Sequence, residues 1–165
     1  MRVVQLLPVP EDKQNVLNNL YQLYHHDFSS FTGEEINESG LYDISLEHYW
    51  RDSRWNPYFI TSGNHIAGFL VVLFENQDID PDPTHVIYDF MILRKFRRQG
   101  LGRAAAQLAF DSFKANWKVA QMSSNEAAIL FWREVIGEYT EQSYTESFRS
   151  DMNKYIQTFS TKCYR

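Results

Sequence analysis

Positive charge and glycine are concentrated in one short stretch of the chain. Residues 94–103 read RKFRRQGLGR and hold five of the 16 Lys and Arg residues and no acid, although the 165-residue chain has a net charge of −5. Glycine lets an anion approach backbone N–H groups, and the first turn of a helix directs free N–H groups and a positive dipole end at an anion. Because a helix is predicted from Leu101, we expect this stretch to bind a phosphate, with arginines adding charge-assisted contacts. The alternative is a solvated basic loop whose glycines serve a turn.

Two common phosphate-binding motifs do not fit this stretch. Residues 100–105 match the dinucleotide pattern G-x-G-x-x-A, but the 65 residues that follow Gly100 are too few for two mononucleotide-binding halves. The pattern G-x-x-x-x-G-K-S/T of a P-loop is absent from the sequence. A different phosphate-containing ligand is therefore expected.

The elements that position this stretch can be read from periodicity and breakers. We expect helices over 11–26, 45–51 (with Ser45 as N-cap), 101–117 and 125–135, and strands over 3–7, 58–61, 66–74, 86–93, 118–122, 139–144 and 153–161. Strands and helices in this order predict an α+β (mixed α/β) fold, with helices on the faces of a mixed sheet. The length predicts one domain over residues 1–165.

Two motifs resemble signatures of the GNAT N-acetyltransferase superfamily, in the bacterial type. The first is similar to the family's pyrophosphate loop, Q/R-x-x-G-x-G/A between a central strand and a helix, and the second to its Asn-x-x-Ala helix. The matching residues are Arg97, Gly100 and Gly102 in the first, and Asn125, Ala128, Phe131 and Trp132 in the second. The order strand, loop, helix, strand, helix also agrees with the family's, so over residues 57–145 the elements and motifs follow one another as they do in the family.

The resemblance implies a fold and a cosubstrate. The fold would be a mostly antiparallel sheet whose middle strands, 86–93 and 118–122, splay apart so that acetyl-CoA enters the gap. Backbone groups near Ile92 would pair with the pantetheine arm, the backbone N–H groups of 98–103 would bind the pyrophosphate, and Asn125 would bond the pantetheine or serve as a helix N-cap. The implied cofactor-binding residues are Ile92, Arg97, Arg98, Gln99, Gly100, Leu101, Gly102, Arg103, Asn125 and Trp132.

The residues that would carry out the reaction match the family less completely than the residues that would bind the cosubstrate. Asp89 is the one charge in the apolar run 86–93, so burial should raise its pKa and suit it as the base for an acceptor amine; the alternatives are a pair with an arginine or a backbone cap. The family often has a tyrosine that protonates the thiolate where this chain has Trp132, and indole is no practical acid. Tyr139 and Tyr88 are weaker substitutes. Nucleophilic catalysis by Cys163 is not expected, since no Cys–His pairing is suggested.

The expected reaction is acetyl transfer from acetyl-CoA to a primary amine, on a small molecule or a peptide, by direct attack in a ternary complex. Acids at positions 34, 35, 38 and 43 suit a cationic acceptor or a solvated loop, and residues 27–55 would form part of the acceptor pocket by family analogy. Two alternatives stay open: a non-catalytic acyl-CoA-binding module, and a toxin that acetylates aminoacyl-tRNA.

Composition limits the partners and the compartment. A net charge of −5 disfavours duplex nucleic acid, and no segment approaches the roughly 20 apolar residues of a membrane span. The single cysteine excludes an intramolecular disulfide and a multi-cysteine metal site, and His25 and His26 lack a third ligand at metal spacing. We therefore expect a cytoplasmic protein without a metal, with a homodimer as a candidate assembly.

Overall fold

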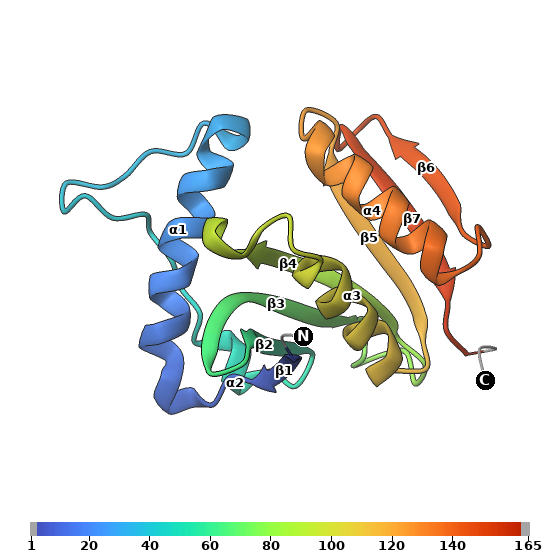
Figure 1. The fold of residues 1–165 in the computed structure, drawn as a ribbon. Coiled ribbons are helices and arrows are strands. Elements are labelled where there is room, and N and C mark those ends of the chain that lie inside the picture. Colours follow the sequence, from blue (N-terminus) through green and yellow to red (C-terminus); the bar gives the residue numbers. More distant parts are fainter. Residues whose placement is uncertain (1–2, 163–165) are drawn as a thin grey trace.

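Seven strands form one sheet, in the order β1-β2-β3-β4-β5-β7-β6, in the computed structural model, which describes residues 3–162 (Figure 1). The strands are β1 (Val4–Pro8), β2 (Trp55–Ser62), β3 (His65–Glu75), β4 (Thr84–Ile92), β5 (Asn116–Met122), β6 (Thr145–Arg149) and β7 (Lys154–Ser160). Neighbouring strands are antiparallel except β4 and β5, which are parallel. The α+β fold expected from the sequence is thereby confirmed.

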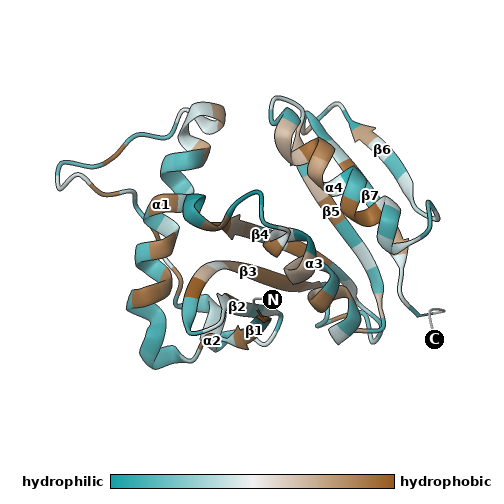
Figure 2. Ribbon diagram, in the orientation of Figure 1, coloured by the Kyte–Doolittle hydropathy of each residue, from teal (hydrophilic) through white to brown (hydrophobic). Residues whose placement is uncertain are grey.

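The helices cover both faces of this sheet. They are α1 (Gln14–Thr32), α2 (His48–Arg51), α3 (Leu101–Ser112) and α4 (Glu126–Tyr139), with short 3-10 turns η1 (Glu11–Lys13) and η2 (Arg94–Phe96). Alternate residues of β3 divide between two cores: Phe69 and Val71 join the core that contains α1 and α2, while Leu70 and Val72 join the core that contains α3 and α4. All four side chains are fully buried, as expected for a central strand covered on both faces. Figure 2 shows the hydrophobic residues gathered along β3 and β4.

Helix α3 is shorter than its apolar pattern predicts. A helix over 101–117 is wrong, because α3 ends at Ser112 and Phe113 is extended, with φ −137° and ψ 124°. The Thr161 hydroxyl donates a 2.7 Å hydrogen bond to the Phe113 carbonyl. Trp117 belongs to β5, where it is buried in the core. A spacing of four residues fits both a helix face and one face of a strand, so Phe113 and Trp117 do not distinguish the two.

The strand expected over 139–144 is also wrong. Helix α4 continues to Tyr139, and the next residues form a turn in which Glu141 and Gln142 have φ of 51° and 66°. The amide of Gln142 donates to the carbonyl of Gly137 at 2.8 Å, which terminates the helix. Strand β6 therefore starts only at Thr145.

Two smaller differences concern the N-terminal half. Helix α1 runs past residue 26 to Thr32 and ends at Gly33, whose φ of 71° is the left-handed conformation common after helix ends. Its buried face includes Tyr21, whereas Leu23 is half exposed. Helix α2 has Glu47 rather than Ser45 as its N-cap.

Cys163 lies outside the described residues.

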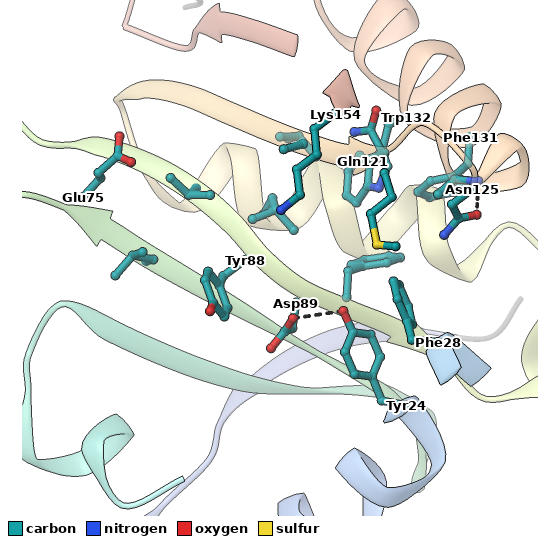
Figure 3. Close-up of a pocket in the computed structure, with 18 residues that line it drawn as sticks. Tyr24, Phe28, Glu75, Tyr88, Asp89, Gln121, Asn125, Phe131, Trp132 and Lys154 are labelled. Carbon is teal, nitrogen blue, oxygen red and sulfur yellow. Dashed lines mark hydrogen bonds between the residues drawn. The ribbon is translucent and has the colours of Figure 1, made fainter. Parts of the chain in front are cut away.

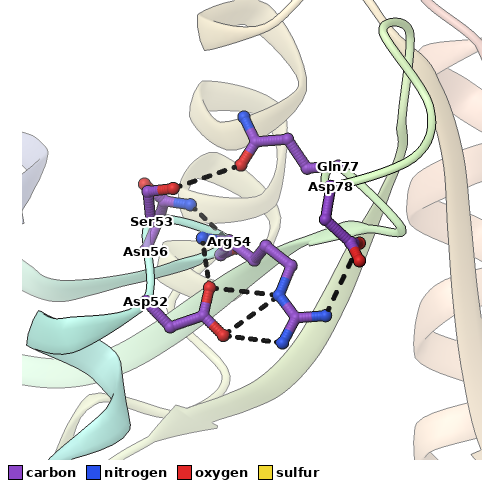
Figure 4. Close-up of polar contacts among 6 residues, drawn as sticks. All are labelled: Asp52, Ser53, Arg54, Asn56, Gln77 and Asp78. Carbon is purple, nitrogen blue, oxygen red and sulfur yellow. Dashed lines mark hydrogen bonds and ion pairs between the residues drawn. The ribbon is translucent and has the colours of Figure 1, made fainter.

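A polar cluster ties the start of β2 to the loop that follows β3 (Figure 4). Arg54 binds Asp52 with its guanidinium Nη2 2.7 Å from Oδ2, and its other terminal nitrogen lies 3.9 Å from Asp78. Ser53 contacts Gln77 at 3.5 Å. These groups lie at the surface, where ion pairs stabilise little, so their main effect is to fix the path of the loop.

Candidate functional site

The two central strands separate partway along their length. Their parallel pairing covers three positions and ends at Ile87–Val119, while β4 continues to Ile92 with β3 as its partner. The splay implied by the family resemblance is therefore present. A pocket of about 500 Å³ opens there (Figure 3). Its lining includes Tyr24, Phe28, Glu75, Tyr88, Asp89, Gln121, Asn125, Phe131, Trp132 and Lys154.

A bulge in β4 places two consecutive side chains at this pocket. Val71 of β3 pairs with Asp89, but the next residue, Val72, pairs with Ile87, so Tyr88 is an extra residue. Alternation would otherwise send Tyr88 and Asp89 to opposite faces. Instead, both lie on the side of α1 and α2, where the Tyr88 ring packs edge-on against Trp55 at 4.8 Å and Asp89 meets α1.

Three tyrosines surround the carboxylate of Asp89. Tyr21 donates to Oδ2 at 2.6 Å, Tyr24 donates to Oδ1 at 2.9 Å, and the hydroxyls of Tyr21 and Tyr49 lie 2.6 Å apart. Tyr21 and Tyr24 come from adjacent turns of α1, and Tyr49 comes from α2. The alternative of an arginine partner for Asp89 does not occur among the described residues. Asp89 is held instead by neutral donors.

This environment raises the pKa of the Asp89 carboxyl and the pKa values of the tyrosine hydroxyls around it. Burial raises the pKa of Asp89 above that of an ordinary aspartate, although the tyrosine hydrogen bonds and the nearby His25 oppose the shift. Burial and the negative charge of Asp89 raise the pKa of Tyr21, Tyr24 and Tyr49. The tyrosines thus remain protonated donors, and the carboxylate binds a proton more readily than it would in water.

At the other end of the gap, the basic stretch has a backbone suited to an anion. Arg98 and Gly100 adopt positive φ values of 59° and 78°, and Gly100 is the N-cap of α3. Turns of this kind direct successive N–H groups into a concavity, next to the positive end of the helix dipole. A Cβ built on Gly100 would meet no atom within 4 Å, so the space above it is open.

Several arginine side chains of this stretch have acidic partners within the chain. Arg97 and Arg94 both bind Asp27 of α1, at 2.5 and 3.2 Å. Partial burial would raise the pKa of Asp27, but the two guanidinium groups lower it overall. Arg103 pairs with Glu134 and Glu138 of α4.

Other groups of the stretch also make internal contacts. Gln99 donates from Nε2 to the carbonyl of Lys95 at 2.8 Å, and the Leu101 side chain is buried in the core. The stretch therefore presents its backbone to a ligand together with the exposed Lys95 and Arg98, while Arg94, Arg97 and Arg103 fix the loop to α1 and α4.

Ile92 has one of its two backbone groups engaged. Leu93 donates its N–H to the carbonyl of Ala67 in β3 at 2.8 Å. Because successive residues of a strand direct their backbone groups to opposite sides, Ile92 directs its N–H and C=O away from β3 and into the gap. The Ile92 carbonyl accepts a 2.6 Å bond from Arg97 Nε. Its amide is the group that remains directed at a ligand.

The opposite wall of the gap comes from α4. Asn125 is the N-cap of this helix, and its side chain accepts from the amide of Ala128 at 3.1 Å. Trp132 is buried, with its ring 5.0 Å from those of both Phe90 and Phe131. The N-cap role considered for Asn125 is thus present.

Gly102 serves the packing of this wall. A Cβ on it would lie 3.2 Å from the ring of Phe131 and 3.5 Å from Ile92. Glycine is therefore needed here for the close approach of α3 to α4, in addition to any approach of a ligand.

The acids expected to attract a cationic acceptor lie elsewhere. From the range 27–55, Phe28 lines the pocket between the strands, whereas Glu34 and Glu35 line a separate surface groove. Glu34 also binds His25 at 2.7 Å. Asp43 accepts a hydrogen bond from Asn37. These contacts favour a structural role for the acidic loop.

Sequence reasoning missed the tyrosines and one lysine of the site. Tyr21 and Tyr24, three residues apart on a helix, share a face, but only the tertiary fold brings that face to Asp89. Lys154, from β7, also lines the pocket. Tyr139, named as a substitute acid, donates instead to Asp111 and is not among the lining residues.

Two kinds of feature are absent from residues 3–162. No helix in this range is long and apolar enough to span a membrane. No group of three or more His, Cys, Asp or Glu side chains there is arranged to hold a metal ion.

Comparisons with known proteins agree with this geometry. Among solved structures, the chain is similar to an acetyltransferase from Thermus thermophilus, with a TM-score of 0.71 and 16% identity over 97% of this chain and 99% of that one. It is also similar to the ribosomal-protein-S18-alanine N-acetyltransferase from Escherichia coli, with a TM-score of 0.59 and 15% identity over 100% and 97%.

A third similar structure is of mutant forms of the spermidine/spermine N-acetyltransferase SpeG from Vibrio cholerae, with a TM-score of 0.59 and 11% identity over 98% and 97%. No curated protein sequence matches the chain significantly. The sequence profile of the acetyltransferase (GNAT) family matches residues 17–137, which is well over half of the chain. The chain therefore belongs to the GNAT acetyltransferase family.

Proposed function

We propose that the chain is a single-domain, cytoplasmic N-acetyltransferase that transfers the acetyl group of acetyl-CoA to a primary amine. The observation that carries the proposal is the pocket that opens where β4 and β5 separate: a buried carboxylate lines it, and the positive-φ backbone of Arg98 and Gly100 follows the end of β4. The solved structures similar to this chain include enzymes named for ribosomal-protein alanine and for spermidine or spermine as acceptors.

The residues present fit acetyl-CoA at three points. The N–H groups of 98–103, above the open space at Gly100, would bind the pyrophosphate. The amide of Ile92 would pair with the pantetheine arm, and Asn125 and Trp132 would border it. Apart from their backbone N–H groups, Arg97, Gln99, Leu101, Gly102 and Arg103 would hold the loop in shape.

Acetyl-CoA supplies an activated acyl group, so no covalent enzyme intermediate is needed. The amine nitrogen attacks the thioester carbonyl carbon, the C–N bond forms and the C–S bond breaks. Asp89 takes the proton that the nitrogen loses. Holding both substrates in one pocket supplies much of the rate. The raised pKa of Asp89 makes it a better base than a solvated aspartate.

A non-catalytic acyl-CoA-binding module is the second candidate, because Trp132 occupies the position where the family often has a tyrosine. Such a module would bind acetyl-CoA but turn over no acceptor.

Thiol release from acetyl-CoA, measured with a panel of primary amines, tests the proposal. The panel holds polyamines, aminoglycosides, amino acids, peptides with free N-termini and aminoacyl-tRNA. We expect turnover with at least one amine, and a loss of about 10²-fold or more in kcat for Asp89→Asn. Asp111→Asn is the matched control, since Asp111 also accepts from a tyrosine, 2.7 Å away, but lies outside the pocket.

The outcomes separate the candidates. Binding without turnover on every amine supports the module, and turnover confined to aminoacyl-tRNA supports a toxin. Equal activity of wild type and Asp89→Asn would remove Asp89 from the mechanism.

A further inference from the structure

The proposed transfer leaves one proton unaccounted for. Asp89 gains a proton from the amine, while the departing sulfur needs one. The indole of Trp132 cannot supply it as an acid, and its ring packs edge-on against Phe90 and Phe131. Some other group in the pocket must connect the carboxyl to the sulfur.

We infer that Tyr24 is a catalytic residue that relays this proton from Asp89 to the departing thiolate. The inference rests on the proposed function and deepens it. Tyr24 lines the pocket from α1, and its hydroxyl points at Asp89, 2.9 Å from Oδ1 (Figure 3). Its position places one hydroxyl in contact with the base and beside the space that the thioester would fill.

The relay balances protons and bonds. As the C–S bond breaks, the Tyr24 O–H bond breaks and its proton goes to sulfur. The proton that Asp89 took from nitrogen then moves from Oδ1 to the Tyr24 oxygen. The products are an amide and a thiol, and both Tyr24 and Asp89 return to their starting states.

The acidities favour this direction. A thiol has an ordinary pKa of about 8.5 and an aspartic acid one of about 3.9, so transfer from the carboxyl to the thiolate is downhill. Tyr24 would be a poor acid by itself, since burial and Asp89 raise its pKa. As a relay it never has to persist as a phenolate, because Asp89 supplies the replacement proton.

Tyr88 also lines the pocket but is less well placed. Its side chain is 53% exposed and packs on Trp55, and the hydrogen bonds to Asp89 come from Tyr21 and Tyr24 instead. A hydroxyl open to solvent would exchange its proton with water rather than with the base.

Tyr21 provides a matched comparison within the same helix. It donates to the other oxygen of Asp89, at 2.6 Å, but it is buried, bonds Tyr49 and does not line the pocket. Removing either hydroxyl takes one hydrogen bond from the carboxylate. Only the loss of the Tyr24 hydroxyl also removes a group that can reach sulfur.

The groups that face Asp89 set its titration. They are Tyr21, Tyr24 and His25 from α1, Tyr49 from α2 and Tyr88 from its own strand. The tyrosine hydrogen bonds lower the pKa of Asp89. Tyr21→Phe and Tyr24→Phe should therefore both move the acidic limb of the pH–rate profile to higher pH.

The test compares kcat, KM and the pH–rate profiles of wild type, Tyr21→Phe and Tyr24→Phe, using thiol release from acetyl-CoA with the best amine. We expect Tyr24→Phe to lower the plateau kcat by about 10²-fold with little change in the KM for acetyl-CoA. We expect Tyr21→Phe to lower the plateau only a few-fold. Calorimetric binding of acetyl-CoA shows that each variant is folded.

Two results would overturn the inference. If both variants lose the same factor on the plateau, Tyr24 only positions Asp89. If Tyr24→Phe keeps the wild-type plateau, water or another group protonates the sulfur. If wild type releases no thiol with any amine, the proposed function itself is contradicted. Wild-type activity, measured first, therefore distinguishes this outcome from the two results above.

Discussion

The guanidinium Nε of Arg97 donates a 2.6 Å hydrogen bond to the carbonyl oxygen of Ile92, the last residue of β4. The same guanidinium reaches Asp27 of α1 through Nη2. One side chain therefore joins the end of the splayed strand, the basic loop and the first long helix. It fixes the loop at the point where the pyrophosphate would bind.

Arg97→Ala should weaken acetyl-CoA binding through the loop rather than through a lost phosphate contact. We expect an affinity loss of several-fold and a decrease of about 1 kcal/mol in the free energy of unfolding, discounted for the partly exposed ion pair. Titration calorimetry and urea unfolding measure the two effects. Arg94→Ala is the control, because Arg94 also binds Asp27 but is mostly exposed and lacks the Ile92 contact. Equal effects from both variants would contradict this role.

The ionisation of Asp89 should influence stability with a definite sign. Its pKa is raised in the folded protein, so the folded state binds more protons than the unfolded state, and stability falls as pH rises from about 4 through the folded pKa. Asp89→Asn removes this dependence. The stability of the variant relative to wild type should therefore increase between pH 4 and pH 7, as measured by urea unfolding at both values. A relative stability that decreases over this range would show that the hydrogen bonds outweigh burial.

Asn125 offers a way to separate a cap from a binding contact. Asn125→Ala removes the acceptor of the Ala128 amide bond and should cost about 1 kcal/mol in the free energy of unfolding. Asn125→Asp keeps an equally good cap but has no amide to donate to a ligand. If the amide donates to acetyl-CoA, Asn125→Asp keeps wild-type stability and loses affinity. Unchanged affinity would leave Asn125 with the cap alone.

Gly68 holds β3 and β4 at their normal separation beside the pocket. A Cβ there would lie 1.9 Å from the backbone carbonyl oxygen of Met91, which a strand cannot accommodate without moving. Gly68→Ala should cost about 3 kcal/mol or prevent folding. Thermal unfolding measures this, with Gly63→Ala in the β2–β3 turn as the comparison: it meets no atom, so it should cost only the roughly 1 kcal/mol of its left-handed φ of 60°. Wild-type stability of Gly68→Ala would mean that the strands separate more easily than their register suggests.

The order of the main helices and strands follows from the sequence, but several boundaries do not, and two of them show why. The extended conformation of Phe113 accompanies a hydrogen bond from Thr161, 48 residues away, which no local pattern contains. The end of α4 depends on left-handed conformations at Glu141 and Gln142, residues that seldom adopt them. Local periodicity predicts these elements but not the long-range contacts that end them.

The candidate site likewise has one part that the sequence predicts and one part that only the tertiary fold assembles. The basic stretch is contiguous, so its composition alone predicts an anion site. The environment of Asp89 is assembled from α1, α2 and a bulge in β4, which brings together residues 68 positions apart. No spacing rule connects Tyr21 or Tyr24 to Asp89 before the fold is known.

The central claim is that the basic loop around Gly100, through its backbone N–H groups and the Arg98 side chain, binds the pyrophosphate of acetyl-CoA. Calorimetric titration of acetyl-CoA into wild type, the double variant Arg98→Ala/Gly100→Val and Gly40→Val tests it most directly. Gly40 has a φ of 76° and open space, like Gly100, but lies in the α1–α2 loop outside the pocket, so it carries the same backbone penalty. We predict one site per chain in wild type and in Gly40→Val, and at least a tenfold loss of affinity in the double variant. Unchanged affinity in the double variant would contradict the assignment of this loop.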